Sequence, residues 1–160
     1  MSYFDILIDF IHLAGVVTWL GGVIFINHVF YKVIDVLPPD QKGKAMGVMT
    51  KHFGRIAWFA IAMLVISGFF NFPDDFNNSN STYNTALNVK VVVILMMISL
   101  AALVSFKLGP ETVSLAANIN TEEDKVKLSS NQIKIKKIGL INMILGFIVL
   151  FLASVLLNAH

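Results

Sequence analysis

The sequence contains no cysteine, few prolines and few charged residues. Without cysteine there is no disulfide framework, thiolate metal site, iron–sulfur cluster or cysteine nucleophile. Charged residues make up 14% of the 160 residues and apolar residues 56%, against roughly 25% and 45–50% in soluble domains. The formal net charge of +2 gives no signature of nucleic-acid binding. The composition therefore favours a membrane protein whose metal ligands would come from four histidines and seven methionines.

Long uncharged stretches predict four membrane-spanning helices. Residues 13–31, 56–73 and 138–160 contain no Asp, Glu, Lys or Arg, and residues 91–106 form a shorter fourth stretch. A helix needs about 20 mostly apolar residues to cross a hydrocarbon core of about 30 Å. We therefore expect an all-α fold, an antiparallel four-helix bundle in the membrane that forms a single domain over residues 1–160. Helices are expected at about 4–33, 46–71, 87–107 and 136–158, with a polar loop at 108–135.

The distribution of Lys and Arg predicts the orientation of this bundle. Eleven of the 12 positive residues fall in or beside the first and third loops, and Lys90 is the exception. Short loops rich in Lys and Arg remain cytoplasmic. We expect both loops inside the cell, and both termini and the loop at 72–86 outside, in a multi-pass protein of the plasma membrane.

A stripe of polar residues enters the first helix from its outer end. Asp9 and His12 lie within about 80° of Trp19 around the helix. In an antiparallel bundle, Lys90 and Ser67 come near the same depth, and polar groups at membrane depth mark functional candidates. We expect Asp9 and Lys90 to act as charge partners beside His12. The alternative is that Lys90 extends to the outer headgroups and that Asp9 lies at the interface.

Two further histidines form a second candidate level near the cytoplasmic side. His28 lies about 24 Å along the helix from His12, and its depth matches that of His52. Such a pair is suited to a metal ion or to the axial positions of haem b, with Lys51 and Arg55 near the propionates. The alternative is that both histidines contact lipid headgroups.

Two methionines are expected near the midplane of the membrane. Thioethers suit Cu(I), so Met63 and Met97 are candidate ligands on a path that begins at His12. The alternative is that both residues pack as ordinary apolar side chains. The sequence shows no nucleophile triad, phosphate-binding loop or zinc-protease motif.

Three segments of the sequence resemble the CopD-like membrane proteins, a group that includes the HemJ-type four-helix proteins. They are residues 12–22 (HLAGVVTWLGG), residues 51–55 (KHFGR) leading to Ser67-Gly68, and residues 87–90 (LNVK). By this resemblance, His12 and Lys90 correspond to the histidine and the lysine of the group.

The residues and the resemblance together leave three alternative functions open. The first is copper handling at or across the membrane, with His12 as the outer ligand and Met63 and Met97 as relay ligands. The second is a membrane oxidoreductase that binds haem b, with either His12 or the pair of His28 and His52 as axial ligands, and oxidises a porphyrin or a quinol. The third is a small accessory subunit of a larger membrane metalloenzyme. Besides the lipid bilayer, the expected partners are therefore membrane proteins or a second copy of the chain.

Overall fold

The computed structural model describes residues 2–71 and 81–158, which form helices joined by short connections. The elements are α1 (Tyr3–Phe25), η1 (Ile26–Phe30), α2 (Tyr31–Asp35), α3 (Pro39–Phe70), α4 (Ser81–Leu103), η2 (Val104–Leu108), α5 (Gly109–Ala117) and α6 (Glu122–Asn158). The elements η1 and η2 are single π-helical turns, so α1 continues into α2 and α4 continues into α5. No strand occurs in this part of the chain, and the predicted all-α fold is confirmed.

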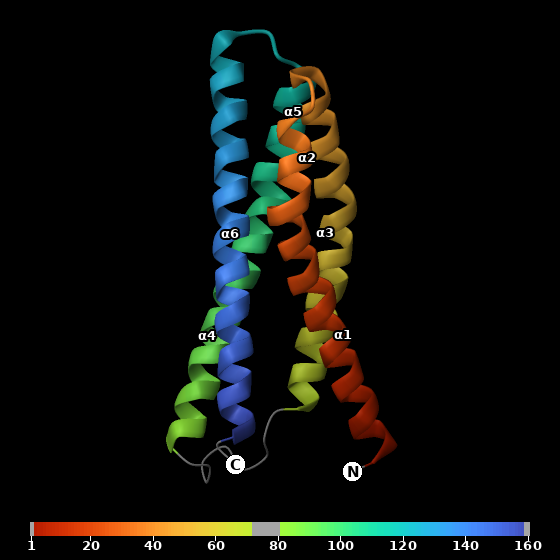
Figure 1. The fold of residues 1–160 in the computed structure, drawn as a ribbon, viewed down its shortest axis with the longest axis vertical. Coiled ribbons are helices and arrows are strands. Elements are labelled where there is room, and N and C mark those ends of the chain that lie inside the picture. The colour runs from red at the N-terminus through yellow and green to blue at the C-terminus, as the bar shows by residue number, and fades with distance from the viewer. Residues whose placement is uncertain (1, 72–80, 159–160) are drawn as a thin grey trace.

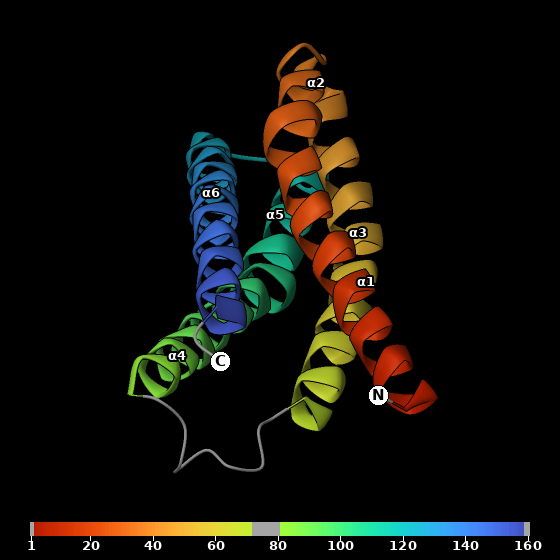
Figure 2. The same cartoon turned by 60° about the horizontal axis from the view of Figure 1, so that its bottom comes forward.

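The four long helices form two pairs. In Figure 1, α1 lies beside α3 and α4 lies beside α6, and the same pairing holds in the rotated view of Figure 2. The two pairs approach each other at the end that contains α2 and α5, where α5 contacts both α3 and α6. They lie apart at the opposite end, where α1 begins and α6 ends.

Three helices begin earlier than the sequence predicted. The second expected helix begins at Pro39 instead of residue 46, because proline fits the first helical turn, where its missing N–H is not needed. The third begins at Ser81 instead of residue 87, and residues 72–80 of the expected outer loop lie outside the described residues. The segment at 108–135, expected as a polar loop between two spans, consists mainly of α5 and the first turns of α6.

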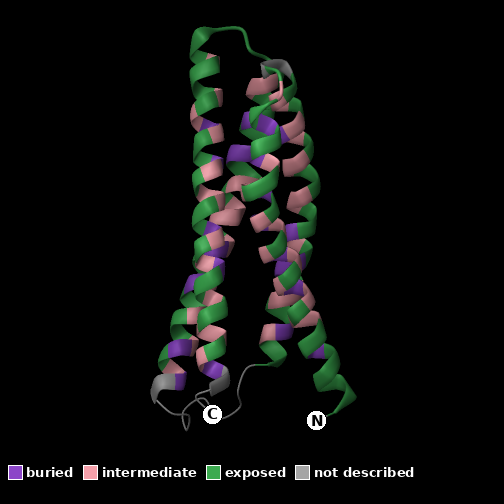
Figure 3. Cartoon of the chain, viewed as in Figure 1, coloured by how far each residue is buried: buried purple, intermediate pink, exposed green. Residues whose placement is uncertain are grey.

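The surface of the bundle is largely apolar. The described residues include four helices that are long and apolar enough to cross a membrane. Figure 3 shows that exposed positions dominate the outside of these helices, while buried positions face neighbouring helices. The chain is therefore a multi-pass membrane protein whose outward-facing apolar side chains contact lipid.

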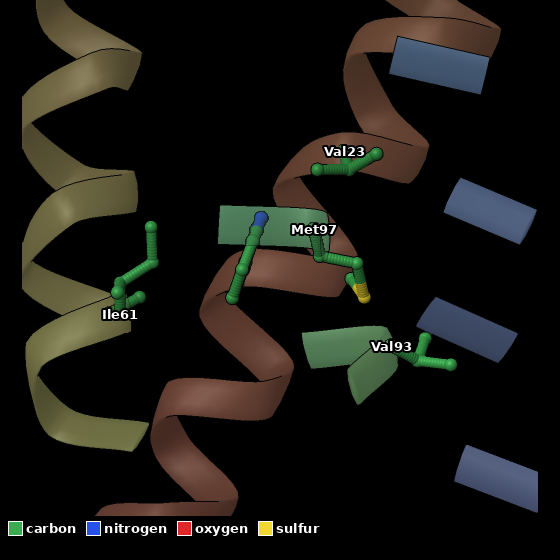
Figure 4. Close-up of a cluster of buried hydrophobic side chains, with 6 residues drawn as sticks. Val23, Ile61, Val93 and Met97 are labelled. Atoms are coloured by element: carbon green, nitrogen blue, oxygen red, sulfur yellow. The ribbon is translucent and has the colours of Figure 1, made fainter. Parts of the chain in front are cut away.

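A small apolar core joins the two helix pairs. Trp19 and Val23 of α1, Ala60 and Ile61 of α3, and Val93 and Met97 of α4 form its buried cluster. Figure 4 shows that Val23, Ile61, Val93 and Met97 come from three different helices. This core lies deeper in the bundle than the outer turns of α1, where the predicted polar stripe begins.

Candidate functional site

His12 forms a hydrogen-bonded contact with Ser67 between α1 and α3. The Nδ1 atom of His12 lies 2.8 Å from the Oγ atom of Ser67. The Ser67 side chain is fully buried, with a relative exposure of 0%, whereas His12 is partly buried. The Ser67 hydroxyl also donates to the carbonyl oxygen of Met63 at 2.6 Å, one turn earlier in α3. This contact joins the two helices through side chains that the sequence placed at the same depth.

The local sequence of the two helices brings this pair together. Gly15, one turn after His12, faces Leu64 and the carbonyl of Ala60, and a side chain at this position would push α1 away from α3. The imidazole edge of His12 lies beside Gly68, where an added Cβ would be 3.8 Å from Cε1, an ordinary van der Waals distance. Small residues allow membrane helices to approach closely. They therefore allow a histidine and a short serine side chain to meet across the interface.

Asp9 lies one turn nearer the end of the bundle and has its own partner on α3. The Nδ2 atom of Asn71 donates a hydrogen bond to Oδ1 of Asp9 at 2.9 Å. Asp9 is exposed, so its carboxylate remains accessible from the end of the α1–α3 pair. Asp9, His12, Ser67 and Asn71 thus form a polar cluster, called here the outer cluster, which is built from α1 and α3.

Lys90 interacts with the outer cluster through long-range electrostatics and makes no direct ion pair with it. The charges of Lys90 and Asp9 both act on the imidazole of His12. No ion pair within 4.0 Å joins Lys90 to Asp9 in the described part of the chain. The reason lies in the fold, because Lys90 is on α4 and the α4–α6 pair lies apart from α1 and α3 at this end. Lys90 is partly buried.

The two candidate methionines lie in different environments. Met63 is partly buried on α3, one turn from Ser67, and its carbonyl accepts the Ser67 hydrogen bond. Met97 is buried in the apolar core, and its Cε atom lies close to Gly146 of α6. Gly146 also faces Leu20 of α1, which is eight residues beyond His12 and therefore about 12 Å further along the helix. His12 and Met97 therefore lie at successive depths and do not form one ligand set.

The second predicted level of histidines stays a prediction. Both His28 and His52 are exposed. The Nδ1 atom of His28 lies 3.3 Å from the carbonyl oxygen of Ile24 in its own helix. No hydrogen bond links either ring to the other, and no group of three His, Asp or Glu side chains gathers among the residues that the structure describes.

Sequence reasoning missed Asn71 and the way Ser67 is hydrogen-bonded. Asn71 is the residue after the last turn of α3, a position that by itself suggests a helix end. Asn71 could have been found from the sequence because it lies at the same depth as Asp9. Antiparallel helices bring residues 9 and 71 to the same end. Which side chain meets which depends on how each helix is rotated, and hydropathy does not determine that rotation.

One comparison with known proteins gives a match. The sequence profile of the family described as CopD: Copper resistance protein D matches residues 47–156, which is more than half of the chain. The matched region includes Met63, Ser67, Lys90 and Met97 but not α1, which carries Asp9 and His12. No curated protein and no solved structure matches the chain.

Proposed function

The chain belongs to the copper resistance protein D family, and on that premise we propose that it handles copper at or across the membrane. The observation that carries the proposal is the outer cluster, in which an imidazole is held between two apolar helices with a carboxylate one turn away. Polar groups at membrane depth are costly and usually functional. Copper is the cargo in this proposal, and the residues of the outer cluster receive it.

The side chains of the outer cluster have complementary roles. Asp9 is exposed and anionic, so it attracts a cation to the end of the α1–α3 pair. The imidazole of His12 supplies a nitrogen ligand that suits copper. Lys90 opposes the charge of the ion, because its positive charge acts on the same imidazole. The two opposite charges limit how tightly the site holds a cation, which suits a site that must also release it.

The methionines extend the proposed path toward the core. Thioether sulfur is a ligand for Cu(I), so Met63 would receive the ion after His12 and Met97 would receive it deeper in the bundle. Met63 is one turn from Ser67, and Met97 reaches the level of Leu20 and Gly146. Because these residues lie at successive depths, the proposal is a sequence of weak sites and not a single three-ligand centre.

The proposed orientation places the outer cluster on the outer face of the plasma membrane. The positive residues near α2, α5 and the start of α6 support this orientation, because loops rich in Lys and Arg remain cytoplasmic. Copper would then enter the outer cluster from outside the cell. In this proposal the path runs inward from the outer cluster to Met97 in the apolar core.

Copper binding by histidine variants tests the function. Purified protein in detergent is titrated with Cu(I) in competition with a coloured chelator. We expect His12→Ala to lose the tightest Cu(I) equivalent, because it removes the imidazole of the outer cluster. His28→Ala is the matched control, since it removes an exposed histidine from the same stretch of helix. Equal Cu(I) binding by the wild type and by His12→Ala would overturn the proposed site.

An absorption spectrum of the same preparations separates copper handling from haem chemistry. We expect no Soret band in the purified protein and none after incubation with haem. A stoichiometric Soret band that disappears in one histidine variant would contradict the copper proposal and favour the haem-binding alternative. A chain that leaves the membrane only within a larger complex, and binds Cu(I) only there, would favour the accessory-subunit alternative.

A further inference from the structure

The hydrogen bonds of Ser67 determine which nitrogen of His12 is free. A serine hydroxyl has one hydrogen to donate and two lone pairs that accept. The Ser67 hydroxyl donates to the carbonyl of Met63 at 2.6 Å and is 3.4 Å from the carbonyl of Leu64. Its single hydrogen is thus directed toward the backbone of its own helix.

The contact with His12 must therefore run in the opposite direction. Because the Ser67 hydrogen points to the backbone of α3, the Ser67 oxygen has only lone pairs to offer to His12. The 2.8 Å contact between Nδ1 and Oγ is then a hydrogen bond in which Nδ1–H donates to Ser67. In a neutral imidazole, a proton on Nδ1 leaves Nε2 with an unprotonated lone pair.

The surroundings of His12 leave that lone pair available. Within the part of the chain that the structure describes, no hydrogen bond to Nε2 of His12 is present. The ring edge at Cε1 lies beside Gly68 of α3. Ser67 is itself completely buried, so solvent does not compete for its hydroxyl.

We infer that Ser67 is a positioning residue that holds His12 as the Nδ1–H tautomer and presents Nε2 as the nitrogen that binds copper. The copper part of this inference rests on the proposed function, whereas the tautomer is a property of the metal-free protein. A histidine ligand that donates its other N–H to a fixed acceptor keeps its ring orientation, and loss of the acceptor costs about 10–100-fold in metal affinity. Ser67 has this role although it touches no ligand.

The tautomer is measured by nitrogen NMR on metal-free protein labelled with ¹⁵N-histidine. The His12 signals are assigned by their loss in His12→Ala. We expect a protonated Nδ1 and an unprotonated Nε2 in the wild type. In Ser67→Ala the Nδ1–H loses its acceptor, and we expect the ring to shift toward the other tautomer. Ser67→Thr keeps a hydroxyl that can donate to the carbonyl one turn earlier, and we expect it to restore the wild-type signals.

Ser99→Ala is the matched control for the loss of a serine hydroxyl. Ser99 of α4 donates to the carbonyl of Leu95 at 2.8 Å, so it makes the same kind of bond within its helix. We expect this variant to keep the wild-type His12 signals and the wild-type Cu(I) affinity. Ser67→Ala should bind Cu(I) about 10–100-fold more weakly, and Ser67→Thr should bind it like the wild type.

The two measurements distinguish failure of the inference from failure of the function. A protonated Nε2 on His12 in the wild type would overturn the inference, even if His12 binds Cu(I). An unchanged tautomer in Ser67→Ala would also overturn it. A Nδ1–H tautomer that depends on Ser67, in a protein that binds no Cu(I), would support the positioning role and contradict the proposed function.

Discussion

Individual polar residues within apolar helices carry most of the functional information in this chain. His12 stands out in the sequence because an imidazole is costly within an uncharged stretch. Its hydrogen-bond partner Ser67 is one of several serines in the helices, and composition alone does not distinguish it. The structure distinguishes it by complete burial and by a contact across helices. At the scale of residues, the sequence therefore identified the costly group, and the structure identified its partner.

Glycine residues on α1 offer a direct test of helix packing. A Cβ added to Gly22 would overlap the ring of Phe53, whereas a Cβ added to Gly21 would meet no atom within 4 Å. We expect Gly22→Val to lower the free energy of unfolding by about 1–3 kcal/mol, because overpacking forces side chains or helices apart. Gly21→Val should not lower it in this way, since it makes the same change in helix propensity without the clash. Unfolding of each variant in mixed micelles with increasing dodecyl sulfate measures the difference, and equal values would contradict the observed contact between α1 and α3.

Among the helices, α6 begins furthest before its predicted start. It has 37 residues, and at 1.5 Å per residue it is about 55 Å long, well beyond a hydrocarbon core of about 30 Å. Its uncharged part begins at residue 138, so the turns before it project from the membrane. Ion pairs join Lys125 to Glu122 and Lys127 to Glu123 at 2.7 Å each, although exposed pairs of this kind stabilise a helix only slightly.

The start of α6 depends on a capping box. Thr121 Oγ1 accepts a hydrogen bond from the backbone N–H of Asp124, and Asp124 Oδ2 accepts one from the N–H of Thr121. We expect Thr121→Ala to lower the local stability of the first turns by about 1 kcal/mol, because an N–H of the helix loses its acceptor. Hydrogen exchange of the amides in the first turns of α6 measures this loss. Thr121→Ser should retain the protection, and unchanged exchange in Thr121→Ala would show that the cap does not hold this end.

The whole molecule consists of two helix pairs that are joined at one end. Near that end, Lys136 of α6 pairs with Asp35 of α2 at 3.1 Å, and its Nζ atom lies 5.1 Å from the centre of the Tyr31 ring. The apolar core and α5 add further contacts between the pairs. The outer cluster lies at the opposite end, where α1 and α3 stand apart from α4 and α6. This arrangement explains why Lys90 influences His12 without pairing with Asp9.

The absence of cysteine makes the orientation easy to measure. Tyr3 is 94% exposed at the start of α1, and Asn118 is exposed between α5 and α6. We expect Tyr3→Cys to react with a membrane-impermeant maleimide in intact cells, and Asn118→Cys to react only after permeabilisation. This expectation follows from the proposed orientation, in which the positive residues around α5 and α6 keep that end cytoplasmic. The wild type, which lacks cysteine, is the blank, and the reverse labelling pattern would contradict the proposed orientation.

The sequence by itself determined that the chain is helical and crosses a membrane, because long uncharged runs are stable only as helices in lipid. It also indicated His12 and the depth of its neighbours, because residue spacing gives depth along a helix at a fixed rise. Only the tertiary structure decided that Ser67 and Asn71 meet α1, that Lys90 and Asp9 remain unpaired, and that Met97 belongs to the core. These contacts depend on helix rotation and on the separation of the two pairs, which packing among all four helices determines and which hydropathy leaves open.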